Sequence, residues 1–124
     1  MLVSTLLSPD PRLQRCAVED PAHVTEGQQG AHVRLIQLAL AITDNADIAG
    51  AESASSSYGP STKAAVLAYK TRRQIINRSY QSVPDAIVGK MTITALDAEV
   101  AAREGRNLAM GAGRPGADIT TKRD

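Results

Sequence analysis

Apolar and polar residues recur with the period of an α-helix in the middle of the chain. A helix should begin at Gly59 or Pro60, because proline suits the first helical position and glycine accepts the non-helical conformation before it. Positions i, i+3, i+4 and i+7 of this helix form one stripe, made of Thr62, Ala65, Val66 and Tyr69. Lys70 falls off the stripe, so the pattern predicts one apolar face and one face in water.

The same spacing, a glycine followed by positions +3, +6 and +7, occurs three times. The three sets are Gly30, Val33, Ile36, Gln37; Gly59, Thr62, Ala65, Val66; and Gly89, Thr92, Ala95, Leu96. A glycine permits the turn before a helix, and a threonine at the third helical position can bond back to an unpaired N–H of the first turn. The repeat predicts three helices that begin alike, although short helical patterns can also match by chance.

The first of these helices should span residues 31–42 and is apolar on nearly all sides, which predicts the central helix of the fold. Gln37 within it is expected to hydrogen-bond a loop backbone, with a ligand contact as the less favoured alternative. The second helix should continue over residues 71–78, where Ile75 and Ile76 would close the core.

The third helix opens after Gly89 and should run toward Met110. Its apolar positions at helical spacing are Ile93, Leu96 and Val100. Gly105 interrupts this segment, and because glycine is a poor helix former it predicts fraying or an early stop there.

The N-terminal part of the chain is rich in proline and glycine. Residues 8–30 are therefore expected to form an extended arm with one short helical turn within 12–18. Leu13 and Val18 are the residues that would attach this arm to the core. We assign residues 1–23 to the N-terminal arm.

The helical domain itself is expected over residues 24–110. Its longest connection, residues 44–57, is polar with a possible helical turn within 49–54, and long loops of this kind often carry function. It is a candidate rim of a binding groove. Residues 111–124 lack apolar periodicity and predict a flexible tail.

Three motifs lie in order within residues 24–100. They are Gly30-x-x-Val33-x-x-Ile36-Gln37-x-x-Leu40, Tyr58-Gly59-x-x-Thr62-x-x-Ala65-Val66-x-x-Tyr69, and Ile87-Val88-Gly89-x-x-Thr92-x-x-x-Leu96. Together they resemble the peptidoglycan-binding domain attached to many bacterial and phage cell-wall hydrolases. The resemblance implies an all-α fold, a small three-helix bundle, here with an extended N-terminal arm and a flexible C-terminal tail.

The same resemblance implies a function. Domains of this family bind cell-wall peptidoglycan noncovalently and position a partner enzyme, so the expected partners are the stem peptide or glycan of peptidoglycan and a hydrolase. The chain departs from the family at Tyr58 and Tyr69, where phenylalanine is usual, and at Lys70, where glutamine is usual. The tyrosines should keep the packing, whereas Lys70 should change a surface charge.

Composition excludes several other classes of function. The 124 residues suffice for one domain with appendages, and the net charge of +1 gives no overall attraction to nucleic acid or membrane. Cys16, the single cysteine, and the two histidines lack the spacing of a zinc site, so neither metal nor cofactor is expected. No catalytic motif is present, and solvation on helix surfaces accounts for carboxylates such as Asp85, Asp97 and Glu99. We therefore expect no enzyme.

The N-terminal segment does not resemble a secretory signal, and no run approaches the ~20 apolar residues of a membrane span. The protein is expected to be made in the cytoplasm and to act at the cell wall or in the periplasm if a route without a leader exports it. This tension keeps an alternative function open. The alternative is a structural or adaptor protein of a phage or contractile injection particle, which uses the same fold to bind an effector or particle protein.

Basic residues are concentrated between Lys63 and Lys90, where six lysines and arginines face one acid, Asp85. Guanidinium forks suit carboxylates, which peptidoglycan stem peptides present. An ordinary solvated helix face explains the same pattern equally well. The chain has three tyrosines and no tryptophan, which favours recognition of the peptide over a long glycan.

The expected binding groove lies between the helix that follows Tyr58, the loop before it and the connection over residues 71–87. Three arginines should hold stem-peptide carboxylates, and two tyrosines should supply flat apolar contact. These candidate ligand-binding residues are Arg72, Arg73, Arg78, Tyr58 and Tyr80. Tyr69, at helical spacing, is expected in the core.

Overall fold

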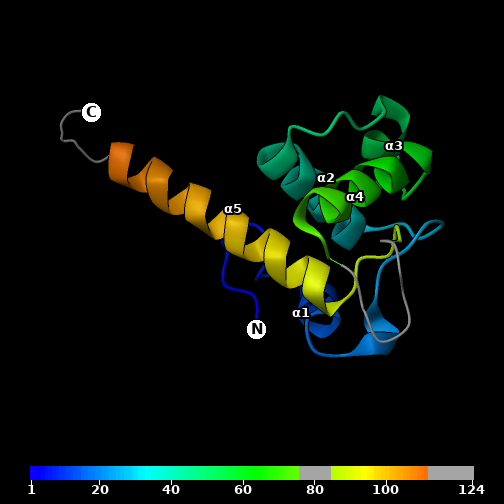
Figure 1. Cartoon of the computed structure of the whole chain (residues 1–124), viewed down its shortest axis with the longest axis horizontal. Helices are drawn as coiled ribbons and strands as arrows, with labels where there is room; N and C mark the ends of the chain where they lie inside the picture. The colour runs from blue at the N-terminus through cyan, green and yellow to red at the C-terminus, as the bar shows by residue number, and fades with distance from the viewer. Residues whose placement is uncertain (76–84, 112–124) are drawn as a thin grey trace.

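The computed structural model describes residues 1–75 and 85–111 of the chain (Figure 1). Within these ranges the protein is mostly helical and has no strand, which confirms the all-α class. The elements are α1 (Pro11–Cys16), the 3₁₀-helix η1 (Asp20–Ala22), α2 (Ala31–Asp44), α3 (Gly50–Ser55), α4 (Pro60–Arg73) and α5 (Lys90–Gly111). The expected C-terminal tail lies outside the described residues, apart from Gly111. Across the described helices, none has the length and apolarity needed to cross a membrane.

Each glycine of the threefold repeat directly precedes a helix, because α2, α4 and α5 begin one residue after Gly30, Gly59 and Gly89. Gly30 has φ of 142°, a conformation that L side chains rarely adopt. The residues at +3 and most of those at +6 and +7 are buried, and Ala65 and Ala95 are partly buried against the core. The prediction that a helix follows each glycine is confirmed, although Gly59, with φ of −110°, does not share the conformation of Gly30.

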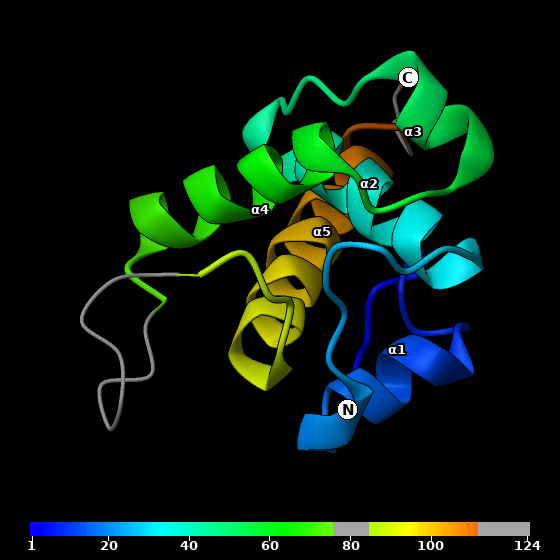
Figure 2. The ribbon, with the colours of Figure 1, turned by 90° about the vertical axis from the view of Figure 1, so that its right-hand side faces the viewer.

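One hydrophobic core joins helices from both ends of the chain. The central position of α2 is confirmed, because it packs against both α4 and α5, and α1 also contacts α5. Figure 2 shows α2 and α4 above α5 and α1 below. Four N-terminal residues belong to the same core as these helices, namely Leu2, Leu7, Leu13 and Cys16. Val18, by contrast, is 60% exposed, so its expected role in attaching the arm is wrong.

Two carboxylates of α5 hold the N-terminal segment by its backbone. Asp97 accepts hydrogen bonds from the N–H groups of Val3 and Ser4, both at 2.8 Å. Glu104 accepts from the N–H groups of Thr5 and Leu6 at 2.8 and 3.0 Å. Asp97 is only 4% exposed, so the expectation that solvation accounts for its carboxylate is wrong. Residues 2–6 are therefore joined to the rest of the fold by hydrogen bonds.

The ends of α4 and α5 differ from the sequence expectation. α4 ends at Arg73, because Gln74 adopts a left-handed conformation with φ of 56°, so the expected continuation through Gln74 and Ile75 is wrong. Ile75 joins the core as expected, whereas Ile76 lies outside the described residues. α5 passes through Gly105 without stopping, and the contacts of Glu104 help to offset the helix penalty of glycine, which is about 1 kcal/mol.

Candidate functional site

A pocket of about 340 Å³ lies between α4 and the loop of residues 45–49 that joins α2 to α3. Its floor consists of three small side chains of α4, namely Ala64, Ala65 and Ala68. Charged residues border it, with Asp44 and Asp47 on the loop side and Arg72 on α4. The pocket therefore lies beside the helix and the preceding loop that the sequence indicated. Residues 76–84 of the expected third wall lie outside the described part.

The loop beside the pocket is fixed to α4 at both ends. At one end, Oδ2 of Asp44 accepts a hydrogen bond from Nη1 of Arg72 at 2.6 Å. At the other end, the backbone N–H of Ala49 donates to the Ser61 hydroxyl at 2.9 Å. The short helix α3 follows, which confirms the helical turn expected within residues 44–57. Its Glu52 lies against the beginning of α4. The pocket thus has a defined wall.

Glu52 caps α4 from outside that helix. Its carboxylate accepts from the backbone N–H groups of Gly59, Ser61 and Thr62 at 3.1, 2.8 and 2.9 Å. These are N–H groups that a helix cannot satisfy by itself. Burial opposes ionisation of Glu52, but the hydrogen bonds from Ser61 and Thr62 outweigh it and lower the pKa of this carboxyl from 4.5 to about 2.

Thr62 extends the cap into the core. Its hydroxyl donates to Glu52 at 2.8 Å, so the expected bond back to its own first turn is wrong. The same hydroxyl accepts from Nε2 of Gln37 at 3.0 Å, and Nε2 also donates to the backbone carbonyl of Ser57 at 2.9 Å. The prediction that Gln37 bonds a loop backbone is confirmed. Nothing in the local sequence pattern indicated Glu52 as a cap.

Arg73 joins three helices through its guanidinium. Nε and Nη2 donate to the two carboxylate oxygens of Glu99 on α5 at 2.5 and 2.6 Å, and Nη1 donates to Oδ1 of Asp44 at 3.1 Å. The group also lies over the Tyr69 ring, 3.8 Å from its centre. The Glu99 hydrogen bond raises the pKa of Arg73, and Arg73 in turn lowers the pKa of Glu99. Glu99 thus contributes to the contact between α4 and α5, and the donors of Arg73 are used within the protein.

This difference between neighbouring arginines makes a testable prediction. Arg73→Ala should lower the free energy of unfolding by about 1.5 kcal/mol, because it removes the two guanidinium donors to Glu99 and the second donor to Asp44. Arg72, which is 62% exposed, contacts only Asp44 within the described residues, so Arg72→Ala should change stability by less than about 0.5 kcal/mol. Urea unfolding of both variants measures the difference. Equal midpoints would contradict the assigned role of Arg73.

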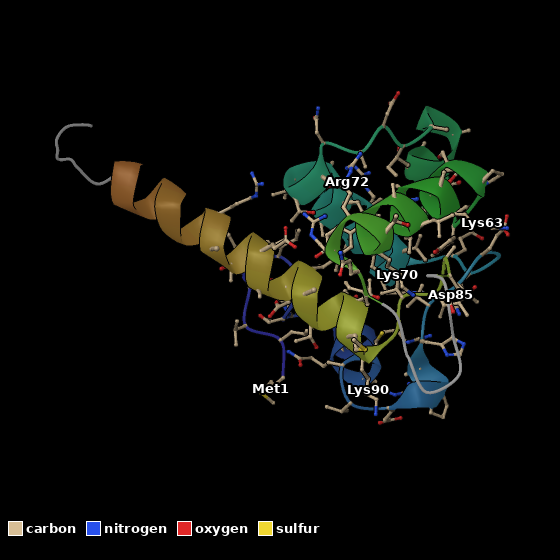
Figure 3. The ribbon with its side chains drawn as sticks, in the orientation of Figure 1. Met1, Lys63, Lys70, Arg72, Asp85 and Lys90 are labelled. Carbon is tan, nitrogen blue, oxygen red and sulfur yellow. The ribbon has the colours of Figure 1, made fainter. Side chains whose placement is uncertain are left out.

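Four of the six basic residues between Lys63 and Lys90 pair with acids, and these four lie on α4. Lys63 pairs with Glu26 at 3.4 Å, and Arg72 and Arg73 share Asp44. Lys70 donates to Asp85 at 2.6 Å and to the carbonyl of Ile87 at 2.8 Å. Because Lys70 is only 6% exposed, the expectation that it changes a surface charge is wrong. Figure 3 shows Lys70 pointing toward Asp85, while Lys63 and Arg72 lie at opposite ends of α4.

Three of the candidate ligand-binding residues, Tyr58, Arg72 and Arg73, lie in the described part of the chain. Of these three, only Arg72 borders the pocket. Tyr58 is 2% exposed, and its hydroxyl donates to the carbonyl of Ala86, so its ring does not offer the flat exposed contact expected of it. Arg78 and Tyr80 lie outside the described residues. Sequence analysis missed the aspartates at the pocket, whose only signal was their place in a long polar loop beside an alanine-rich helix.

Chemistry elsewhere in the described ranges is limited. Residues 1–75 and 85–111 contain no cluster of three or more histidine, cysteine, aspartate or glutamate side chains able to hold a metal ion. Burial raises the pKa of the Cys16 thiol to about 11, and the thiol donates to the carbonyl of Val88.

Comparison of the chain with protein-family models, with curated proteins and with solved structures finds no match in any of the three.

Proposed function

We propose that the protein binds bacterial cell-wall peptidoglycan noncovalently, as a targeting module without catalytic activity of its own. In this proposal α2, α4 and α5 form the three-helix bundle of peptidoglycan-binding domains. The three motif glycines support this, because each directly precedes one of these helices. A partner hydrolase would be positioned at the wall by this module.

The observation that carries the proposal is the pocket beside α4. It combines a largely exposed guanidinium, Arg72, with loop carboxylates above a floor of alanine side chains. Stem peptides carry carboxylates and short side chains, which suit a fork donor above a small apolar floor. A glycan strand would require exposed aromatic rings, and the two tyrosines within the described residues, Tyr58 and Tyr69, are both buried.

Co-sedimentation with purified sacculi tests this function, at low salt and at about 0.5 M salt. The protein should pellet with the sacculi in both conditions, and Arg72→Ala should weaken binding about tenfold through the loss of a charged hydrogen-bond donor. Lys63→Ala is the matched control, because it removes the same charge from the same helix at a residue that does not border the pocket.

Two outcomes would contradict the proposal. Binding that disappears at high salt and falls equally in both variants would indicate loose surface attraction. Absence of binding at both salt concentrations would indicate that the fold serves to bind another protein.

A structural or adaptor role in a phage or contractile injection particle is the second candidate function. The observation that favours it is the C-terminal part of α5, which extends beyond the other helices (Figure 1). Such a projecting helix presents a long surface to another protein. An adaptor should remain in the supernatant when sacculi are pelleted.

A further inference from the structure

The charges around the pocket do not balance, and their arrangement indicates a ligand. Asp44 is nearly buried, and its two oxygens are occupied by Arg72 and Arg73. Arg73 is in turn paired with Glu99. These four groups form a neutral set of two cations and two anions. Asp47 adds one more negative charge, because it is exposed and makes no hydrogen bond or ion pair with any residue in the described part.

Arg72 retains donors on the opposite border of the pocket. Of its guanidinium N–H groups, only those of Nη1 bond a described residue, at Asp44. The other donors of the planar fork can bind a carboxylate in two places at once. The pocket lining therefore includes one anionic group on the loop, Asp47, and one cationic donor on α4, Arg72, together with the three alanines of α4.

We infer that this pocket recognises the free head group of an α-amino acid, with the ammonium at Asp47 and the carboxylate at Arg72. A ligand with carboxylates alone would leave Asp47 without a counter-charge, and a ligand with ammonium groups alone would leave the remaining N–H donors of Arg72 without an acceptor. The volume of about 340 Å³ suits one small head group better than a glycan strand.

This inference rests on the proposed function for its biological source. Within a stem peptide that contains diaminopimelate, the free end of this side chain carries an ammonium and a carboxylate on one carbon. The C-terminal residue of the peptide offers only a carboxylate. The pocket would thus distinguish wall in which the diamino acid is free from wall in which its ammonium is used in a cross-link.

The wall of the pocket is built in advance of binding. Its loop is attached to α4 by the Asp44 contact at one end and by Ala49 and Glu52 at the other. A preformed site of this kind loses less conformational entropy when a ligand binds. The attachments also leave Asp47 in the middle of the loop, away from both anchors.

The test uses three small molecules of matched length and the full chain. Diaminopimelate carries two amino acid head groups, pimelate carries only the carboxylates, and cadaverine carries only the ammonium groups. We expect diaminopimelate to shift the amide NMR signals of Asp47, Ala68 and Arg72. Pimelate and cadaverine at equal concentration should leave these signals in place.

Two substitutions locate the charges. Asp47→Asn and Arg72→Gln should each weaken the diaminopimelate response about tenfold, while Lys63→Gln should retain it. Asp47 and Arg72 make few contacts, so dispersed spectra of the variants should show that they fold. An equal response to pimelate or to cadaverine, or an undiminished response in either pocket variant, would overturn the inference.

The result is independent of binding to sacculi. If the protein binds sacculi but diaminopimelate shifts none of its amide signals, the head-group inference is overturned and the proposed function still stands. A diaminopimelate response without binding to sacculi would support the pocket chemistry and overturn the proposed function.

Discussion

Tyr69→Ala should lower the free energy of unfolding by about 4 kcal/mol, as expected for the truncation of a fully buried aromatic side chain. The ring packs in the core, and its hydroxyl donates to Glu99 at 2.7 Å. The substitution also removes the ring beneath the Arg73 guanidinium. Tyr69 thus supports both the apolar core and the ionic contact between α4 and α5. Urea unfolding followed by circular dichroism measures the loss.

Tyr69→Phe separates these contributions. It keeps the ring and removes only the hydrogen bond to Glu99, so the expected loss is about 1 kcal/mol. Burial and the Glu99 contact both raise the pKa of Tyr69, which keeps the hydroxyl protonated and able to donate at neutral pH. If Tyr69→Ala left the unfolding midpoint unchanged, the ring would lie at the surface and the assigned face of α4 would be wrong.

Glu52→Ala should lower the free energy of unfolding by about 2.5 kcal/mol, because three backbone N–H groups at the start of α4 lose their acceptor. The loop beside the pocket should loosen as well, since α3 would lose its attachment to α4. Glu26→Gln is the control, because it removes a carboxylate from the exposed pair with Lys63 and should have almost no effect. Denaturant unfolding at neutral pH compares the two variants. Similar losses in both would show that the cap contributes little.

The contribution of Glu52 should depend on pH with a defined sign. Its pKa in the folded state is lowered from 4.5 to about 2, so the folded state binds this proton less readily than the unfolded state. The stabilisation by ionised Glu52 is complete above pH 4.5 and is lost as the pH falls toward 2. The difference in stability between the protein and Glu52→Gln should therefore shrink on acidification. A difference that is constant between about pH 7 and pH 3 would contradict the lowered pKa.

Local signals in the sequence determined much of the fold. The three helix starts follow from glycines at which the chain turns, and the buried positions of α5 follow from its apolar period at Ile93, Leu96 and Val100. The helical turn before Tyr58 also lies where polar and small residues indicated it. Each of these features depends on residues a few positions apart, which is why the sequence pattern could indicate them.

Contacts between distant segments could not be predicted in this way. The basic excess from Lys63 to Lys90 was counted along the chain, but Glu26, Asp44 and Glu99 come from other segments and pair with Lys63, Arg72 and Arg73. The spacing of apolar residues along the chain cannot show that the ammonium group of Lys70 binds Asp85.

The different positions of the candidate site residues could not be predicted for the same reason. Arg72 and Arg73 are adjacent and chemically alike, and only the position of α5 directs one inward and leaves the other at the pocket. Tyr58 stands at a helix entrance, where the sequence is compatible with either a buried or an exposed ring. Its contact with Ala86, 28 positions away, decides between them.

The carboxylates of Asp97 and Glu104 impose an order of events during synthesis. They bind the backbone of residues 3–6, which lie 93 to 99 positions earlier in the chain. A ribosome adding about 5–20 residues per second needs roughly 5–20 s to cover that separation. Throughout this interval Leu2 and Leu7 lack the helix on which they pack. The segment that leaves the ribosome early therefore joins the core only after α5 has emerged.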